Sequence, residues 1–146
     1  MYSYKYPRPA VTADCVVFGI SSEGDRLLLL VQRGNESFKG MWALPGGFLN
    51  MDETLEECAR RELKEETGIE TTAHFEELKS FSAIGRDPRG RTITVAFMVE
   101  VPLTEVAGGD DAAEAHWFTL AELPPLAFDH AEVVQLALHR LGLTKQ

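Results

Sequence analysis

The feature that most constrains this chain is the stretch GFLNMDETLEECARRELKEETGI, which runs from Gly47 to Ile69. Within it, Leu55, Ala59 and Leu63 recur every four positions. That spacing places the three side chains on one face of an α-helix and predicts that this face is buried. The many charged residues of the stretch are expected on the opposite, solvent-facing side.

Both ends of this predicted helix carry signals of their own. Thr54, followed three positions later by Glu57, forms a capping-box pattern, and Asp52 is an alternative cap at the same end. Gly68 suits the left-handed residue that ends many helices, and Ile69 can pack back against the last turn. The pattern therefore bounds the helix on both sides.

Three carboxylates on this helix are closely spaced. Glu62, Glu65 and Glu66 lie at positions i, i+3 and i+4, so we expect them to share one patch of helix surface. Like charges at this spacing repel, and only a cation or an arginine offsets the repulsion. Carboxylate oxygens are hard ligands, so the expected ion is Mg²⁺ or Mn²⁺. Arg61 is expected to point elsewhere, where its planar fork can pair with Glu53.

The spacing of these residues resembles the Nudix box, GX5EX7REUXEEXGU with U aliphatic, and every specified position is filled. The alternative, an acidic helix face in solvent, accounts for the three glutamates. It does not account for Gly47, Glu53, Arg61 and Gly68 at fixed spacing. The resemblance implies a single Nudix hydrolase domain over residues 1–146, of the α/β class, folded as an α/β/α sandwich around a mixed, twisted sheet.

By the same resemblance, the activity is hydrolysis of a nucleoside diphosphate linked to another moiety, with cleavage of the pyrophosphate bond. The implied metal-binding residues are Gly47 (through its carbonyl), Glu62, Glu65 and Glu66. The implied catalytic residues are Glu53, Arg61, Glu62 and Glu65. The general base stays open between a box glutamate and an acid on a later loop, where the candidates are Asp110, Asp111 and Glu114.

A second feature is the basic segment GRDPRGR at residues 85–91, which predicts the polar tip of a β-hairpin. Arg86, Arg89 and Arg91 concentrate positive charge in a chain whose net charge is −9. We expect these three arginines to bind the phosphate or the far end of the substrate. The alternative is an ordinary soluble hairpin tip.

Two further pieces, GRDPRGRTITVAF and LPPLAFDHAE, are similar to Nudix proteins of the ADP-ribose pyrophosphatase kind. They are also similar to the Nudix portion of regulators of NAD synthesis, which carry a winged-helix DNA-binding segment after it. Because the chain ends at Gln146, we expect a stand-alone hydrolase that converts ADP-ribose to AMP and ribose 5-phosphate. The alternatives are a nucleoside triphosphate house-cleaning enzyme and a non-catalytic Nudix module that senses a nucleotide.

The remaining segments fit this architecture. Strands are predicted where β-branched and apolar residues concentrate, at 11–20, 26–32, 75–84, 92–101 and 114–120. The run LLLLV at 27–31 is continuous rather than alternating, which indicates a strand buried on both faces. A closing helix is predicted to begin with Asp129 and Glu132 as a cap-like pair. Its expected buried face consists of Val133, Leu136, Ala137 and Leu141.

Composition limits the possible binding partners and the cellular compartment. The net charge of −9 and the pI near 4.9 disfavour a nucleic-acid binder, which needs a basic face. No apolar run is long enough to cross a membrane, and Cys15 and Cys58 are expected to be small buried residues, so a cytoplasmic protein without a membrane partner is expected. Residues 1–10 are expected to form a loosely docked arm, although their alternating tyrosines leave open an edge strand that pairs across a homodimer.

Overall fold

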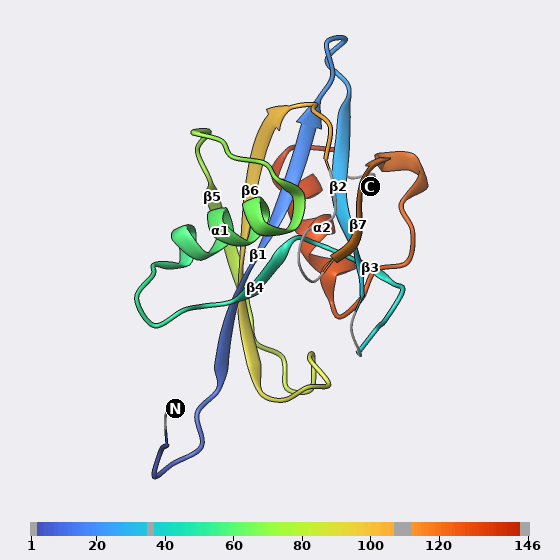
Figure 1. Cartoon of the computed structure of the whole chain (residues 1–146). Coiled ribbons are helices and arrows are strands. Elements are labelled where there is room, and N and C mark those ends of the chain that lie inside the picture. Colours follow the sequence, from blue (N-terminus) through green and yellow to red (C-terminus); the bar gives the residue numbers. More distant parts are fainter. Residues whose placement is uncertain (1–2, 35–36, 107–111, 144–146) are drawn as a thin grey trace.

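The computed structural model describes residues 3–34, 37–106 and 112–143. Within these ranges the chain forms one seven-stranded sheet, two α-helices and a short 3-10 helix (Figure 1). The strands are β1 (Ala10–Ile20), β2 (Arg26–Arg33), β3 (Trp42–Ala43), β4 (Gly46–Phe48), β5 (Glu76–Phe81), β6 (Thr92–Pro102) and β7 (Ala112–Thr119). The helices are α1 (Leu55–Thr67), η1 (Leu120–Glu122) and α2 (His130–Arg140).

The sheet is mixed, as predicted. The central strand β1 runs parallel to β6 along its whole length, from the pair Ala10–Thr92 to the pair Ile20–Pro102. The other pairings between described strands are antiparallel and join β1 with β2 and β4, β2 with β3 and β7, and β5 with β6. The predicted hairpin on either side of the basic segment is confirmed, although its first strand ends at Phe81 rather than at residue 84.

Side chains alternate across β1 and divide the core into two layers. Cys15 and Val17 belong to one apolar cluster with Leu63 of α1, whereas Phe18 belongs to a second cluster with Val133 of α2. Figure 1 accordingly shows α1 in front of the sheet and α2 behind it. The predicted α/β/α sandwich is therefore confirmed, because each helix buries its apolar face on its own side of one sheet.

The continuous apolar run of β2 is buried on both faces. Leu29 and Val31 pack in the cluster beneath α1, while Leu28 and Leu30 pack in the cluster beneath α2. A strand covered on both sides has no face for polar residues, which explains the lack of alternation. Residues 3–9 precede β1 without regular secondary structure. Neither α-helix in the described part of the chain is long and apolar enough to cross a membrane.

The predicted ends of α1 are confirmed. Thr54 Oγ1 accepts a hydrogen bond from Glu57 N (3.1 Å), and the Glu57 carboxylate accepts one from Thr54 N (2.8 Å), so the capping box is complete. Asp52 is not the cap. Gly68 has a left-handed backbone with φ of 81°, and its N–H donates to Lys64 O at 2.8 Å. Local sequence signals thus set both ends of this helix.

The start of α2 differs from the prediction. Asp129 occupies the N-cap position, but its side chain makes no capping hydrogen bond. Both of its carboxylate oxygens instead accept hydrogen bonds from Arg86, at 2.8 and 2.6 Å. The buried residues of α2 are His130, Val133, Val134, Ala137 and Leu138. Leu136 and Leu141, which were expected on this face, are only half-buried.

Candidate active site

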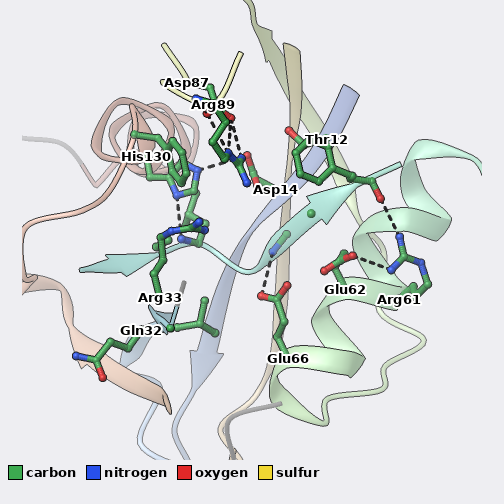
Figure 2. A pocket seen from close by; sticks show the side chains of 18 of the residues that line it. Thr12, Asp14, Gln32, Arg33, Arg61, Glu62, Glu66, Asp87, Arg89 and His130 are labelled. Carbon is green, nitrogen blue, oxygen red and sulfur yellow. Dashed lines mark hydrogen bonds and ion pairs between the residues drawn. The ribbon is translucent and has the colours of Figure 1, made fainter. Parts of the chain in front are cut away.

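A pocket with a volume of about 400 Å³ opens where β1, β4 and α1 meet the segment before α2 (Figure 2). We call one side the α1 wall, which consists of Gly46, Gly47, Phe48, Arg61, Glu62 and Glu66. We call the other side the opposite wall, which consists of Arg33, Arg86, Asp87, Arg89, Phe128 and His130. In Figure 2, Glu62 and Glu66 lie toward α1, Arg33 and His130 lie away from it, and Asp14 lies between the two groups.

The strand β4 brings its backbone very close to two carboxylates. A Cβ atom on Gly46 would meet Asp14 Oδ1 at 2.2 Å and a backbone carbonyl oxygen at 2.4 Å. A Cβ atom on Gly47 would lie 2.5 Å from the Glu62 carboxyl carbon. At Gly46 the nearby backbone atoms leave room only for glycine, whereas at Gly47 a larger residue would displace the Glu62 carboxylate. The Gly47 carbonyl, which the resemblance implies as a metal ligand, accepts a hydrogen bond from Cys58 Sγ at 3.6 Å.

Arg61 joins the loop, β4 and the helix. Its Nε and Nη2 donate to the two carboxylate oxygens of Glu53 at 2.9 and 2.6 Å, the pairing that the sequence indicated. The expectation that Arg61 points away from the other glutamates is wrong, because Nη1 donates to Glu62 (2.7 Å) and Glu65 (3.2 Å). Nη2 also donates to the Phe48 carbonyl at 3.0 Å. The hydrogen bonds from Arg61 lower the pKa of Glu53 to about 2.

The three closely spaced glutamates do not share one environment. Glu66 is 9% exposed and accepts a hydrogen bond from Gly46 N at 3.4 Å, whereas the Glu65 side chain is 46% exposed. Burial and the neighbouring Glu62 carboxylate raise the pKa of Glu66 well above its ordinary value. A proton or a bound cation is needed to offset this pair of acids.

The donor chemistry of the α1 wall fits a hard divalent cation. Glu62 and Glu66 present adjacent carboxylate oxygens, the ligands that Mg²⁺ and Mn²⁺ prefer. Among the described residues, however, no three His, Cys, Asp or Glu side chains are grouped as ligands around one point. The physical reason is that Arg61 holds Glu62 and Glu65 while Glu66 is turned under β4.

Two of the three arginines of the basic segment, Arg86 and Arg89, line the pocket. Arg86 is almost fully buried, with a side chain 4% exposed, and both of its hydrogen bonds to a carboxylate go to Asp129. Arg89 lines the pocket but pairs with Asp87, with N–O distances of 2.7 to 3.2 Å. Arg91 does not line the pocket and donates to backbone carbonyls of its own loop.

The buried polar residues at the pocket that were not anticipated as site residues from the sequence include Asp14 and His130. Asp14 Oδ2 accepts a hydrogen bond from Thr94 Oγ1 at 2.6 Å and lies 3.5 Å from His130 Nε2. Burial acts to raise the pKa of Asp14, but His130 and Thr94 hold it below its ordinary value. His130 Nδ1 accepts a hydrogen bond from Leu44 N at 3.0 Å, which leaves Nε2 facing Asp14. A lone carboxylate inside the apolar strand β1 was the signal for Asp14.

Of the later-loop acids that were considered as general base, only Glu114 lies within the described residues. Asp110 and Asp111 lie outside the described residues. Glu114 is exposed on β7, 3.1 Å from His116 Nε2, and does not line the pocket. The described carboxylates that do line the pocket are Asp14, Glu62, Glu66 and Asp87.

Comparison with known proteins identifies related sequences. A family model of the NUDIX domain matches residues 8–137. An ADP-ribose pyrophosphatase of Methanocaldococcus jannaschii is 43% identical over 134 residues, which cover 89% of this chain and 73% of the relative. The ADPR responsive transcriptional repressor NtrR of Acinetobacter baylyi is 37% identical over 94% of this chain. This chain spans only 56% of the length of that repressor.

Solved structures with the same fold include two Nudix proteins. The NUDIX domain of Shewanella oneidensis NrtR complexed with ADP ribose has a TM-score of 0.87 at 33% identity, covering 96% of this chain and 94% of that one. A MutT/nudix family protein from Enterococcus faecalis has a TM-score of 0.87 at 34% identity, covering 97% of this chain and 65% of that one. The complete box, the sandwich fold and the match over residues 8–137 agree, and the chain belongs to the Nudix family of hydrolases.

Proposed function

We propose that this Nudix hydrolase cleaves the pyrophosphate bond of ADP-ribose to give AMP and ribose 5-phosphate. The observation that carries the proposal is the 43% identity to the M. jannaschii ADP-ribose pyrophosphatase over most of both chains. The similar S. oneidensis domain was solved with ADP ribose, which supports the same ligand. The pocket is compatible, because it has carboxylates on one wall and guanidinium groups on the other.

In the proposed reaction, a water oxygen forms a bond to one phosphorus atom while the bridging P–O bond breaks. Nudix hydrolases generally need a divalent metal, which when bound neutralises phosphate charge and lowers the pKa of water. Glu62 and Glu66, with the Gly47 carbonyl, are the residues that would hold Mg²⁺ or Mn²⁺ here. Glu53 acts through Arg61, which orients Glu62. A carboxylate of the α1 wall accepts the proton that the attacking water loses.

A second candidate is binding of ADP-ribose without hydrolysis. It is favoured by the 37% identity to an ADPR responsive repressor over 94% of this chain. A nucleoside triphosphate hydrolase remains the alternative within the same chemistry, since the box specifies pyrophosphate cleavage and not the group attached to it.

One set of measurements separates these candidates. The protein is incubated with ADP-ribose in Mg²⁺, in Mn²⁺ and in EDTA, and AMP and ribose 5-phosphate are quantified. Binding is measured in parallel by calorimetry in EDTA. We expect equimolar products only with a divalent metal, and a higher kcat/KM for ADP-ribose than for each nucleoside triphosphate. Binding without product under every metal condition would establish a sensor, and a preference for triphosphates would overturn the substrate assignment.

We also propose a cytoplasmic homodimer that acts on a small-molecule nucleotide without a nucleic-acid or membrane partner. Cys15 and Cys58 are free and buried, which suits a reducing compartment. The net charge of −9 disfavours contact with nucleic acid. Exposed apolar side chains at Tyr6 (68%) and Met51 (74%) provide surface for a second copy. Light scattering at micromolar concentration should give twice the chain mass of 16.2 kDa, and a monomeric mass would contradict the dimer.

A further inference from the structure

The ring of Phe128 contacts two positively charged side chains at the pocket. The guanidinium carbon of Arg33 lies 4.9 Å from the ring centroid, and that of Arg89 lies 5.1 Å from it. Arg89 also lies 4.9 Å from the ring of Phe48 on the α1 wall. Guanidinium groups at these distances are attracted by the face of an aromatic ring. Both guanidinium groups therefore contact one ring, and they are near enough for their like charges to interact.

The two guanidinium groups differ in how their charge is balanced. Arg89 is paired with the buried carboxylate of Asp87, whose side chain is 1% exposed. Arg33 donates from Nε to the Ser37 carbonyl at 2.8 Å and forms no ion pair with any carboxylate in the described part of the chain. Burial, and then the like charge of Arg89, lower the pKa of Arg33 from its ordinary value, but arginine stays protonated in proteins. The opposite wall thus carries a positive charge that an anion would offset.

The backbone at Phe128 is itself unusual. Its φ of 54° lies in the left-handed region, which a residue with a bulky side chain rarely adopts. Neighbouring contacts hold this conformation in place. Ala127 N donates to Trp42 O at 2.8 Å, and Asp129 is bound by Arg86 through two hydrogen bonds. Strain of this kind persists where the surroundings enforce it, and it is concentrated at functional sites.

We propose that Phe128 is a positioning residue for substrate binding, whose ring holds Arg33 and Arg89 together as a binding site for the diphosphate of the substrate. The inference rests on the proposed function for the identity of the substrate. Two guanidinium groups on one wall match the negative charge of a diphosphate, and the carboxylates of the α1 wall lie across the same pocket. Arg86 enters this account as the residue that fixes the backbone next to Phe128, not as a phosphate ligand.

The left-handed backbone offers a clean test. Glycine adopts this conformation readily, so Phe128→Gly removes the ring without requiring a new backbone path. Phe128→Leu keeps apolar bulk but loses the aromatic face, and Phe128→Tyr keeps that face. Ile84→Gly is the control for loss of a large apolar side chain, because Ile84 is 92% exposed and does not line the pocket. Phe38 also has a positive φ (62°), but its ring packs against that of Phe128 with centroids 4.8 Å apart, so it is not an independent control.

Binding of ADP-ribose and of inorganic pyrophosphate is measured by calorimetry in EDTA, and kcat and KM are measured in Mg²⁺. We expect Phe128→Gly and Phe128→Leu to raise the Kd and the KM for ADP-ribose about tenfold while kcat changes by less than about threefold. Phe128→Tyr should restore the Kd to within about threefold of the original protein, and Ile84→Gly should stay in that range. Thermal melting of each variant confirms that it is folded.

The outcomes separate this inference from the proposed function. If the protein binds ADP-ribose but does not cleave it, the proposed function fails, and a raised Kd in Phe128→Gly still supports the inference. If cleavage is efficient and Phe128→Gly matches Ile84→Gly in Kd and KM, the inference fails alone. A Leu variant that binds as well as the Tyr variant would also overturn it. If the original protein neither binds ADP-ribose or pyrophosphate in EDTA nor cleaves ADP-ribose in Mg²⁺, both proposals are wrong.

Discussion

The two walls of the pocket are built in different ways. Most of the α1 wall comes from one continuous stretch, in which helical spacing places Glu62 and Glu66 near the turn at Gly47. The opposite wall is assembled from the end of β2, the loop between β5 and β6 and the segment that enters α2. Local spacing therefore predicts the first wall well, whereas only long-range packing brings the second together.

Two arginines make the difference concrete. Arg61 and Arg86 each donate two hydrogen bonds to one carboxylate. The partner of Arg61 is Glu53, eight positions away on the same motif, and its pairing was predicted. The partner of Arg86 is Asp129, 43 positions away in another element. The sequence indicated only that Arg86 is one of three clustered arginines expected to bind the substrate, and it gave no sign of this distant carboxylate partner.

The largest expected effect comes from removing the buried acid of the α1 wall. Glu66→Gln should lower kcat for ADP-ribose on the order of a thousandfold, because a metal-ligating charge is lost. The folded state should be no less stable, since the repulsion between Glu62 and Glu66 is relieved. The measurements are steady-state kinetics at saturating Mg²⁺ and thermal melting. Unchanged turnover would exclude Glu66 from the metal site.

Glu65→Gln is the matched comparison for this prediction. The side chain of Glu65 is 46% exposed and contacts Arg61, whereas Glu66 is buried beside Gly46. We therefore expect a clearly smaller loss of kcat for Glu65→Gln than for Glu66→Gln. Equal losses would mean that the exposed glutamate turns inward when metal and substrate bind.

Much of the fold follows from local patterns in the sequence. The capping box at Thr54, the left-handed Gly68 and the doubly buried run of β2 all depend on neighbours within a few positions, and the structure confirms them. The environment of each glutamate could not be predicted in the same way. Neighbouring positions on a helix point about 100° apart, so Glu66 lies buried under β4 while Glu65 points into solvent.

The opposite wall shows why the rest could not be predicted. Nothing near Asp129 in the sequence reveals that Arg86 takes both of its oxygens and prevents it from capping α2. Arg33 and Phe128 have no distinguishing local pattern in the sequence. They line the pocket only because the last residue of β2 and the segment that enters α2 meet there. Contacts between distant segments are decided by tertiary packing.

A second prediction tests whether the opposite wall depends on its long-range ion pair. Arg86→Ala should lower the free energy of unfolding by about 3 kcal/mol, since it leaves the Asp129 carboxylate largely buried without its partner. Arg91→Ala, on the same loop, should change it by less than about 0.5 kcal/mol, because its side chain contacts only backbone carbonyls there. Urea denaturation at pH 7 provides both values. Equal effects would show that the Arg86–Asp129 pair does not stabilise the fold.

The smallest effect is expected on the α1 wall, where Arg61 and Glu53 join the loop to the helix. Hydrogen bonds from Arg61 lower the pKa of Glu53 to about 2, below its ordinary value of 4.5. A carboxylate with a lowered pKa in the folded state stabilises the protein above its unfolded pKa, and this stabilisation is lost as the pH falls through the folded value. The Glu53→Gln variant has no carboxylate at this position to be protonated. The stability of the variant should therefore depend less on pH between 5 and 2 than that of the original protein.

We therefore expect the original protein to exceed Glu53→Gln in stability by about 1 kcal/mol at pH 7, the upper range for a partly exposed pair. The difference should shrink steadily as the pH falls from 5 toward 2. Urea denaturation of both proteins across this range tests the prediction, and Glu23→Gln, which changes an exposed glutamate in the turn between β1 and β2, controls for the general loss of carboxylate charge. A constant difference would mean that Glu53 stabilises the loop by packing and not by its charge. In that case the local pairing with Arg61 would matter less for the α1 wall than the distant pairing of Arg86 matters for the opposite wall.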